Sequence, residues 1–157
     1  MRTLAIVAVL AAAAAADEKP PAAESAAVKS CLAELEKTRK GTYQDCVGKA
    51  VALCLDGPET MAVFDCQIHE TAIWDELLNA RYRELSRLLP KPVFDELREV
   101  QRAWVKYRDA KCTFNQSLPD VGETGRDKME HGCRLDETAR RANELEQLRA
   151  WRAKLAK

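Results

Sequence analysis

The chain has 157 residues, and its 25 lysines and arginines are balanced by 25 aspartates and glutamates. This balance excludes a polybasic nucleic-acid binder and a strongly acidic tail, and the length fits one small globular domain. Six glycines and six prolines are too few for a chain dominated by loops. The six cysteines are the most informative count, but their meaning depends on the cellular compartment.

The N-terminus is typical of a secretory signal peptide. A short basic start, residues 1–3, precedes an uncharged apolar stretch of 13 residues, 4–16. This stretch is too short to cross a bilayer as a helix. The small residues at its end predict cleavage after Ala16, and we expect no stable membrane insertion elsewhere. The protein is therefore expected in the periplasm or outside the cell, where cysteines oxidise.

After the signal peptide, the composition predicts a helical chain. Residues 17–25 are rich in proline, alanine and charge and are expected to form a disordered lead-in. Residues 26–157 are expected to form a single domain, because Ala, Leu, Glu, Lys and Arg dominate between short Gly or Pro breaks. Helices are predicted over 26–38, 42–55 and 58–89, from 92 to Lys111 or Phe114, and from a capping box at Asp127 and Glu130 onward. No stretch alternates with period two, so the expected fold is an all-α bundle of four to five helices.

Three of these helices carry apolar stripes that we expect to face the core. The stripe of the third comprises Ile73, Leu77, Leu78, Tyr82, Leu85, Leu88 and Leu89. That of the fourth comprises Val93, Leu97, Val100, Trp104, Tyr107 and Phe114. The last helix contributes Leu135, Ala139, Ala142, Leu145, Leu148 and Leu155. Trp74 is also expected in the core, Trp151 is expected to be partly exposed, and the charged face around Arg140, Arg141, Glu144 and Glu146 is expected to be solvated.

The cysteines, at positions 31, 46, 54, 66, 112 and 133, predict three disulfides in an exported chain. Nearest-neighbour pairing would give Cys31–Cys46, Cys54–Cys66 and Cys112–Cys133, each tying a helix junction. A crossed alternative, Cys31–Cys54 with Cys46–Cys66, remains open, because Cys46 and Cys54 share a helix face. The sequence contains no C-x-x-C pair. Cys66 and His69 form a C-x-x-H fragment, but no second pair of ligands that would complete a metal site accompanies it. We therefore expect neither a metal nor a cofactor.

An ordered set of residues from Cys54 onward carries a resemblance to a known family. It begins Cys54-x11-Cys66, Glu70, Trp74-Asp75, Leu78-Asn79, Tyr82 and Leu85. It continues with Leu97, Gln101-Arg102-Ala103-Trp104, Tyr107-Arg108-Asp109, Cys112, Cys133 and Thr138-x-Arg140. This pattern resembles the lysozyme-inhibitor LprI-like N-terminal domain family of exported bacterial proteins. The resemblance is strongest over 54–148, and Cys31 and Cys46 lie in an N-terminal extension before it.

The resemblance implies a small, disulfide-linked, all-helical periplasmic domain that binds rather than catalyses. Lysozyme inhibition is attributed to at least one member, so the implied partner is a lysozyme or another envelope protein. The alternative is a periplasmic protein–protein interaction or structural module with no hydrolase affinity.

The motif residues can also be interpreted physically. Asp75, Asn79 and Tyr82 share one face of the third helix, and Gln101 and Asp109 lie with Arg108 on the fourth. We favour a polar network that sets how these two helices pack, since buried polar groups need partners. A recognition surface is the alternative. Asp75 and Asp109 could pair for acid–base chemistry, but no nucleophile accompanies them, so no catalytic residue is predicted.

The polar segment 114–127 is the best place for partner recognition, although an ordinary surface loop is the simpler interpretation. It lies between Cys112 and Cys133 and carries Asp120 and Glu123. Many lysozymes are strongly basic, so an acidic loop could be steered to such a target.

Overall fold

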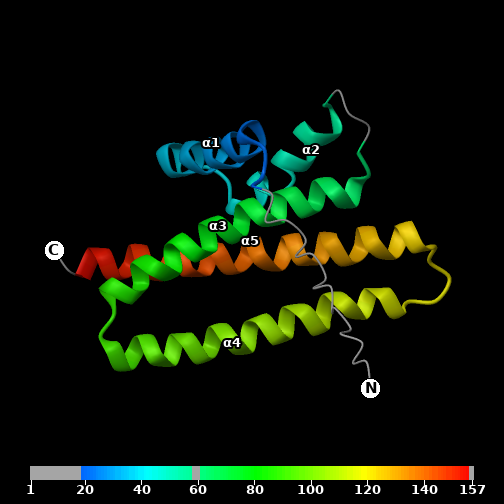
Figure 1. Ribbon diagram of the computed structural model, residues 1–157. Helices are drawn as coiled ribbons and strands as arrows, with labels where there is room; N and C mark the ends of the chain where they lie inside the picture. The colour runs from blue at the N-terminus through cyan, green and yellow to red at the C-terminus, as the bar shows by residue number, and fades with distance from the viewer. Residues whose placement is uncertain (1–18, 58–60, 156–157) are drawn as a thin grey trace, which may run out of the picture.

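The computed structural model describes residues 19–57 and 61–155, so the predicted signal peptide lies outside the described residues. The all-α prediction is confirmed, since the described residues contain no strand. They form five α-helices and two short 3₁₀ helices, labelled η (Figure 1). In chain order these are α1 (Ala22–Thr38), η1 (Tyr43–Cys46), α2 (Lys49–Leu55), α3 (Val63–Leu88), α4 (Lys91–Thr113), η2 (Phe114–Ser117) and α5 (Glu123–Leu155).

The core is built around α3 and α5, which share the largest interface and run side by side in Figure 1. From α3 it takes Ile73, Trp74, Leu78 and Leu85, and from α5 it takes Leu135, Ala139, Ala142 and Leu145. The large ring of Trp74 is fully buried in the same cluster as the small Ala139 and Ala142 of α5. Each large apolar side chain buried here contributes roughly 1.5–3 kcal/mol. The stripes predicted for the third and last helices are therefore confirmed at their central positions.

The N-terminal extension belongs to the same core. Val28 of α1, Cys46 of η1 and Ala50 of α2 are all fully buried in the cluster formed by α3 and α5. The helix α1 also begins at Ala22, four residues before the predicted start at Ala26. The disordered lead-in predicted for 17–25 is therefore wrong over its last four residues, because Glu24 is only 7% exposed in the first turn of α1.

The single helix predicted over 42–55 is wrong, because two short helices occupy this segment. The break falls at Gly48, whose φ of +90° lies in the left-handed region that favours glycine. The fully buried Glu70 of α3 accepts hydrogen bonds from the backbone N–H groups of Gly48 at 2.7 Å and Val51 at 2.9 Å. This carboxylate satisfies donors at the start of α2 and so stabilises the interruption.

Two other predicted helix starts also differ. The third helix begins at Val63 rather than near Pro58, and Met61 and Ala62 are not helical. The last helix begins at Glu123, before the predicted capping box of Asp127 and Glu130. Both acidic side chains lie inside α5 and accept hydrogen bonds from Gln116 of η2 instead of capping the helix.

The stripe predicted to bury α4 is largely exposed, so that prediction is wrong. Exposure is 46% for Val93, 52% for Val100, 54% for Tyr107 and 63% for Phe114. In Figure 1, α4 lies at the edge of the molecule alongside α5, and Cys112 is its one buried residue. Only Leu97 and Trp104 of the predicted stripe pack against the core. The periodicity correctly indicated a helix, but α4 has too few neighbours to cover the whole stripe.

Candidate functional site

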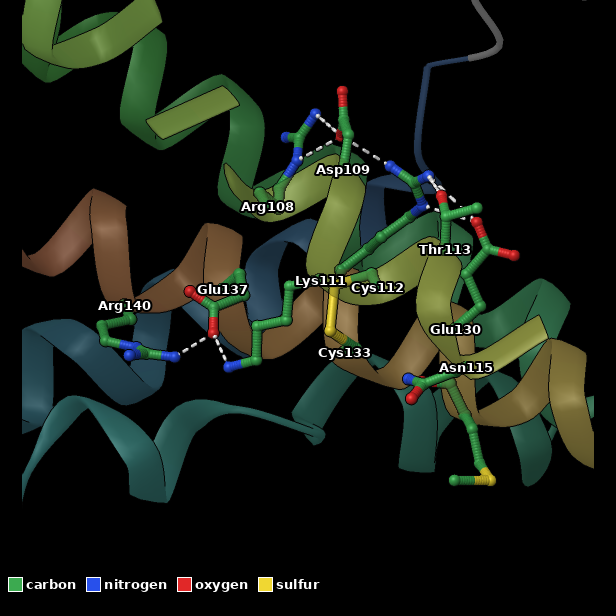
Figure 2. Close-up of a disulfide and its surroundings, with 12 residues drawn as sticks. Arg108, Asp109, Lys111, Cys112, Thr113, Asn115, Glu130, Cys133, Glu137 and Arg140 are labelled. Atoms are coloured by element: carbon green, nitrogen blue, oxygen red, sulfur yellow. Dashed lines mark hydrogen bonds and ion pairs between the residues drawn. A yellow bond between two sulfur atoms is a disulfide. The ribbon is translucent and has the colours of Figure 1, made fainter. Parts of the chain in front are cut away.

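The three cysteine pairs are Cys31–Cys46, Cys54–Cys66 and Cys112–Cys133, which is the nearest-neighbour arrangement rather than the crossed one. The third disulfide joins the end of α4 to α5 and frames the predicted partner loop (Figure 2). Its two Cα atoms are 5.4 Å apart, and Cys112 is fully buried. The helical hairpin formed by α4 and α5 is thus fixed close to its tip.

The tip of this hairpin carries the two acidic residues singled out from the sequence. Asp120 is exposed and adopts a φ of +61°, and Glu123 is exposed at the first position of α5. Among the described residues, neither side chain forms an ion pair or a hydrogen bond. Both carboxylates therefore remain available to a partner.

The base of the tip is held by amide side chains from η2. Gln116 donates hydrogen bonds from Nε2 to Asp127 at 3.0 Å and to Glu130 at 2.7 Å. Asn115, which is labelled in Figure 2, donates to the backbone carbonyl of Met129 at 3.0 Å. These bonds fix the chain on both sides of the tip, so Asp120 is presented from an ordered base.

A cluster of ion pairs lies on one side of the disulfide. Asp109 accepts hydrogen bonds from Arg108 at 2.9 and 3.0 Å and from Arg134 of α5 at 2.8 Å. Arg134 also donates to Glu130 at 2.9 Å. Burial alone would raise the pKa of Asp109 and that of Glu130. Their hydrogen bonds, from the two arginines to Asp109 and from Gln116 and Arg134 to Glu130, outweigh this effect and hold both pKa values below the usual range.

On the other side of the disulfide, Glu137 of α5 is only 3% exposed and is bonded by Lys111 of α4 and by Arg140 (Figure 2). The hydrogen bond to Glu137 raises the pKa of Lys111, which keeps the amine protonated. The two ionic clusters and the disulfide therefore bind α4 to α5 at three points.

The polar residues of the sequence motif do not join the third and fourth helices as predicted. Gln101 accepts a hydrogen bond from Arg141 of α5 at 2.9 Å, and Arg141 and Arg108 lie 6.0 and 5.0 Å from the centre of the Trp104 ring. The network therefore ties α4 to α5, because α5 is the helix on which α4 packs. The solvated face predicted around Arg141 is wrong at this position, since its side chain is only 11% exposed.

The motif residues of α3 have local partners instead. Asn79 donates to Asp75, one turn earlier, at 2.7 Å. Leu78 on the same helix is buried, and the Tyr82 ring lies 5.0 Å from that of Phe94 near the turn into α4. Arg102 bonds Glu99 on its own helix at 2.7 Å, and Tyr107 is exposed.

These two sets of motif residues face each other across a cleft between α3 and α4, with a volume of about 320 Å³. Its lining includes eight residues of the motif, Asp75, Leu78, Asn79, Tyr82, Gln101, Arg102, Trp104 and Arg108. The motif set is therefore brought together in space, but around an open cleft rather than in a closed network.

A model of the lysozyme inhibitor LprI family matches residues 54–145, more than half of the chain. The chain belongs to this family. The LprI match runs from Cys54 in α2 through most of α5, so it includes two of the three disulfides and leaves α1 and η1 outside. The chain has no significant match among curated proteins or among solved structures.

Within the LprI domain, the structure adds residues whose role the sequence did not reveal. Glu70 belongs to the motif, but its contact with the N-terminal extension depends on the break at Gly48, which no pattern predicted. Arg81 of α3 donates to Glu146 of α5 at 3.0 Å, so Glu146 is not purely solvated either. The sequence pattern does not indicate that Arg134 links α5 to α4. Charged residues of α5 occur both at exposed positions and at positions that bond to neighbouring helices, so their spacing does not distinguish the two.

Within the described residues, one group of potential metal ligands occurs outside the motif cleft. Oxygen, sulfur and nitrogen atoms of Glu24, Cys54 and His69 lie within 4.8 Å of one another. The Cys54 sulfur is already bonded to Cys66 and cannot bind a metal as a thiolate. Only two ligands remain, with 3.3 Å between His69 Nδ1 and a carboxylate oxygen of Glu24.

Among the described residues, no helix combines the length and apolar character needed to span a bilayer.

Proposed function

We propose that the protein is exported and that it binds and inhibits a lysozyme. The observation that carries this proposal is membership of the lysozyme inhibitor LprI family over residues 54–145. The signal-like N-terminus and the three disulfides support export to an oxidising compartment.

We further propose that the tip of the α4–α5 hairpin makes the contact. Asp120 and Glu123 are exposed, lack partners among the described residues and project from a base held by a disulfide. An ordered loop loses little conformational entropy on binding. Its negative charge favours association with the basic surface that many lysozymes present.

The inhibition would be steric rather than chemical. Asp109 is held ionised by two arginines, and Asp75 is bonded to Asn79. Carboxylates with these partners support occlusion of a hydrolase better than catalysis.

The experiment measures the hydrolysis of cell-wall suspensions by several classes of lysozyme with increasing amounts of the purified, disulfide-intact protein. The double variant Asp120→Asn, Glu123→Gln removes both tip charges, and asparagine tolerates the positive φ at position 120. We expect its inhibition constant to rise about tenfold at low salt, and less at high salt.

The matched control is Glu36→Gln, Glu96→Gln, which removes two exposed charges elsewhere and should inhibit normally. Failure of the native protein to inhibit any lysozyme would reject the proposed function. Normal inhibition by the Asp120, Glu123 variant would reject only the role of the tip.

A further inference from the structure

The cleft between α3 and α4 is the feature that the proposed function leaves unused. Asp75, Asn79 and Tyr82 line its α3 wall, and Arg98, Arg102 and Arg108 line its α4 wall. Its volume of about 320 Å³ is that of about ten water molecules in the liquid. Pockets for small ligands begin near 300 Å³, so the cleft has room for a molecule of disaccharide or dipeptide size.

The polar groups of the two walls do not bond to each other. Asn79 bonds Asp75 within α3, while Arg102 bonds Glu99 and Arg98 bonds Asp95 at 3.0 Å within α4. In the described part of the chain, no hydrogen bond or ion pair crosses the cleft. The remaining hydrogen-bonding capacity of these side chains is therefore directed to water or to a ligand.

Contacts made by the lining residues hold the walls of the cleft in place. The tilted rings of Tyr82 and Phe94, whose centroids are 5.0 Å apart, lie at the end near the turn between the helices. Trp104 is fixed by the guanidinium group of Arg108 at 5.0 Å, and its neighbour Gln101 is bonded to α5 at 2.9 Å. Because the walls are already fixed, a ligand loses little binding free energy to ordering them.

The charges of the walls indicate the ligand. Three arginines and one aspartate line the cleft. Arg108 is already bonded to Asp109, whereas Arg98 and Arg102 are 45% and 64% exposed. Their acidic partners lie on the same exposed helix surface, where ion pairs are weak and easily exchanged. A guanidinium group binds a carboxylate through two parallel hydrogen bonds. The Asp75–Asn79 pair on the opposite wall can accept from, and donate to, a hydroxyl or an amide.

We propose that this cleft binds a small ligand bearing a carboxylate next to hydroxyl or amide groups. Arg98 and Arg102 bind the carboxylate, and Asp75 and Asn79 bind the neutral polar groups. An acidic glycan and a peptide with a free C-terminus share this chemistry. The proposal goes beyond lysozyme inhibition and does not depend on it.

The test is a titration of the ¹⁵N-labelled, disulfide-intact protein followed by NMR. The probes are N-acetylmuramic acid, whose free carboxylate is carried by the sugar, an N-acetylated dipeptide with a free C-terminus, and the neutral disaccharide N,N′-diacetylchitobiose. We expect at least one carboxylate probe to shift the Trp104 indole and Asn79 amide signals saturably, while chitobiose does not. The tighter of the two carboxylate probes then identifies a glycan or a peptide as the source.

The variant Arg98→Gln, Arg102→Gln should bind the carboxylate probe at least tenfold more weakly, with an unchanged melting temperature. The control Arg83→Gln, Arg87→Gln removes two exposed arginines of α3 outside the cleft and should bind normally. Absence of binding by both carboxylate probes, equal binding of chitobiose, or full binding by the Arg98, Arg102 variant would overturn the proposal. That variant should still inhibit lysozyme, so the two proposals fail separately.

Discussion

Glu70 is the residue that joins the LprI domain to the extension before it. Its carboxylate is fully buried and accepts three N–H groups, from the backbone of Gly48 and Val51 and from the indole of Trp74 at 3.1 Å. Two of the donors belong to the extension, and the third belongs to the α3–α5 core. A buried carboxylate is tolerated here because its hydrogen bonds replace those it made with water.

Replacing Glu70 with Gln keeps the shape of the side chain but leaves one oxygen where there were two. The new NH₂ group would then face an N–H donor, so we expect the free energy of unfolding to fall by about 1–3 kcal/mol. Urea unfolding with intact disulfides measures this change. Glu76→Gln on the exposed face of the same helix should change it by less than about 0.5 kcal/mol. Equal effects of the two substitutions would show that the three hydrogen bonds contribute nothing.

At the scale of elements, periodicity predicted which segments are helical but not which helices pack together. The central residues of α3 and α5 are buried as predicted because both helices lie at the centre of the molecule. The stripe of α4 has the same spacing yet is exposed, since the spacing of apolar residues identifies a face and not its neighbour. The predicted motif network failed for the same reason, because Gln101 bonds α5 rather than α3. The sequence thus placed eight of the cleft's lining residues in one motif, but it missed Arg98 and Val105 and could not indicate that the cleft is open.

The different burial of these two stripes has measurable consequences. Leu78→Ala removes a side chain that is 2% exposed, so we expect a loss of about 2–5 kcal/mol in the free energy of unfolding. Val100→Ala removes a side chain that is 52% exposed, so the loss should be below about 0.5 kcal/mol. Thermal unfolding of both variants tests this, and a large effect at Val100 would mean that the stripe of α4 is buried in solution.

At the scale of the whole molecule, the three disulfides act on different parts of one core. The pairs Cys31–Cys46 and Cys54–Cys66 bind the extension to itself and to α3, where Val28 and Ala50 are also buried. By contrast, α4 has one buried residue, and that residue is Cys112. Packing therefore holds the extension and the centre, while the hairpin of α4 and α5 depends more on its covalent link and its ion pairs.

Removing this link with Cys112→Ala, Cys133→Ala should lower the free energy of unfolding by about 3 kcal/mol, because the disulfide closes a loop with a sequence separation of 21. The loss should also be uneven. Amides of α4 should exchange hydrogen much faster, while those of α3 around Trp74 remain protected by the core. The matched variant Cys31→Ala, Cys46→Ala should speed exchange in α1 and leave α4 unchanged. Uniform acceleration over all five helices in both variants would contradict this division, since it would mean that the helices open only together.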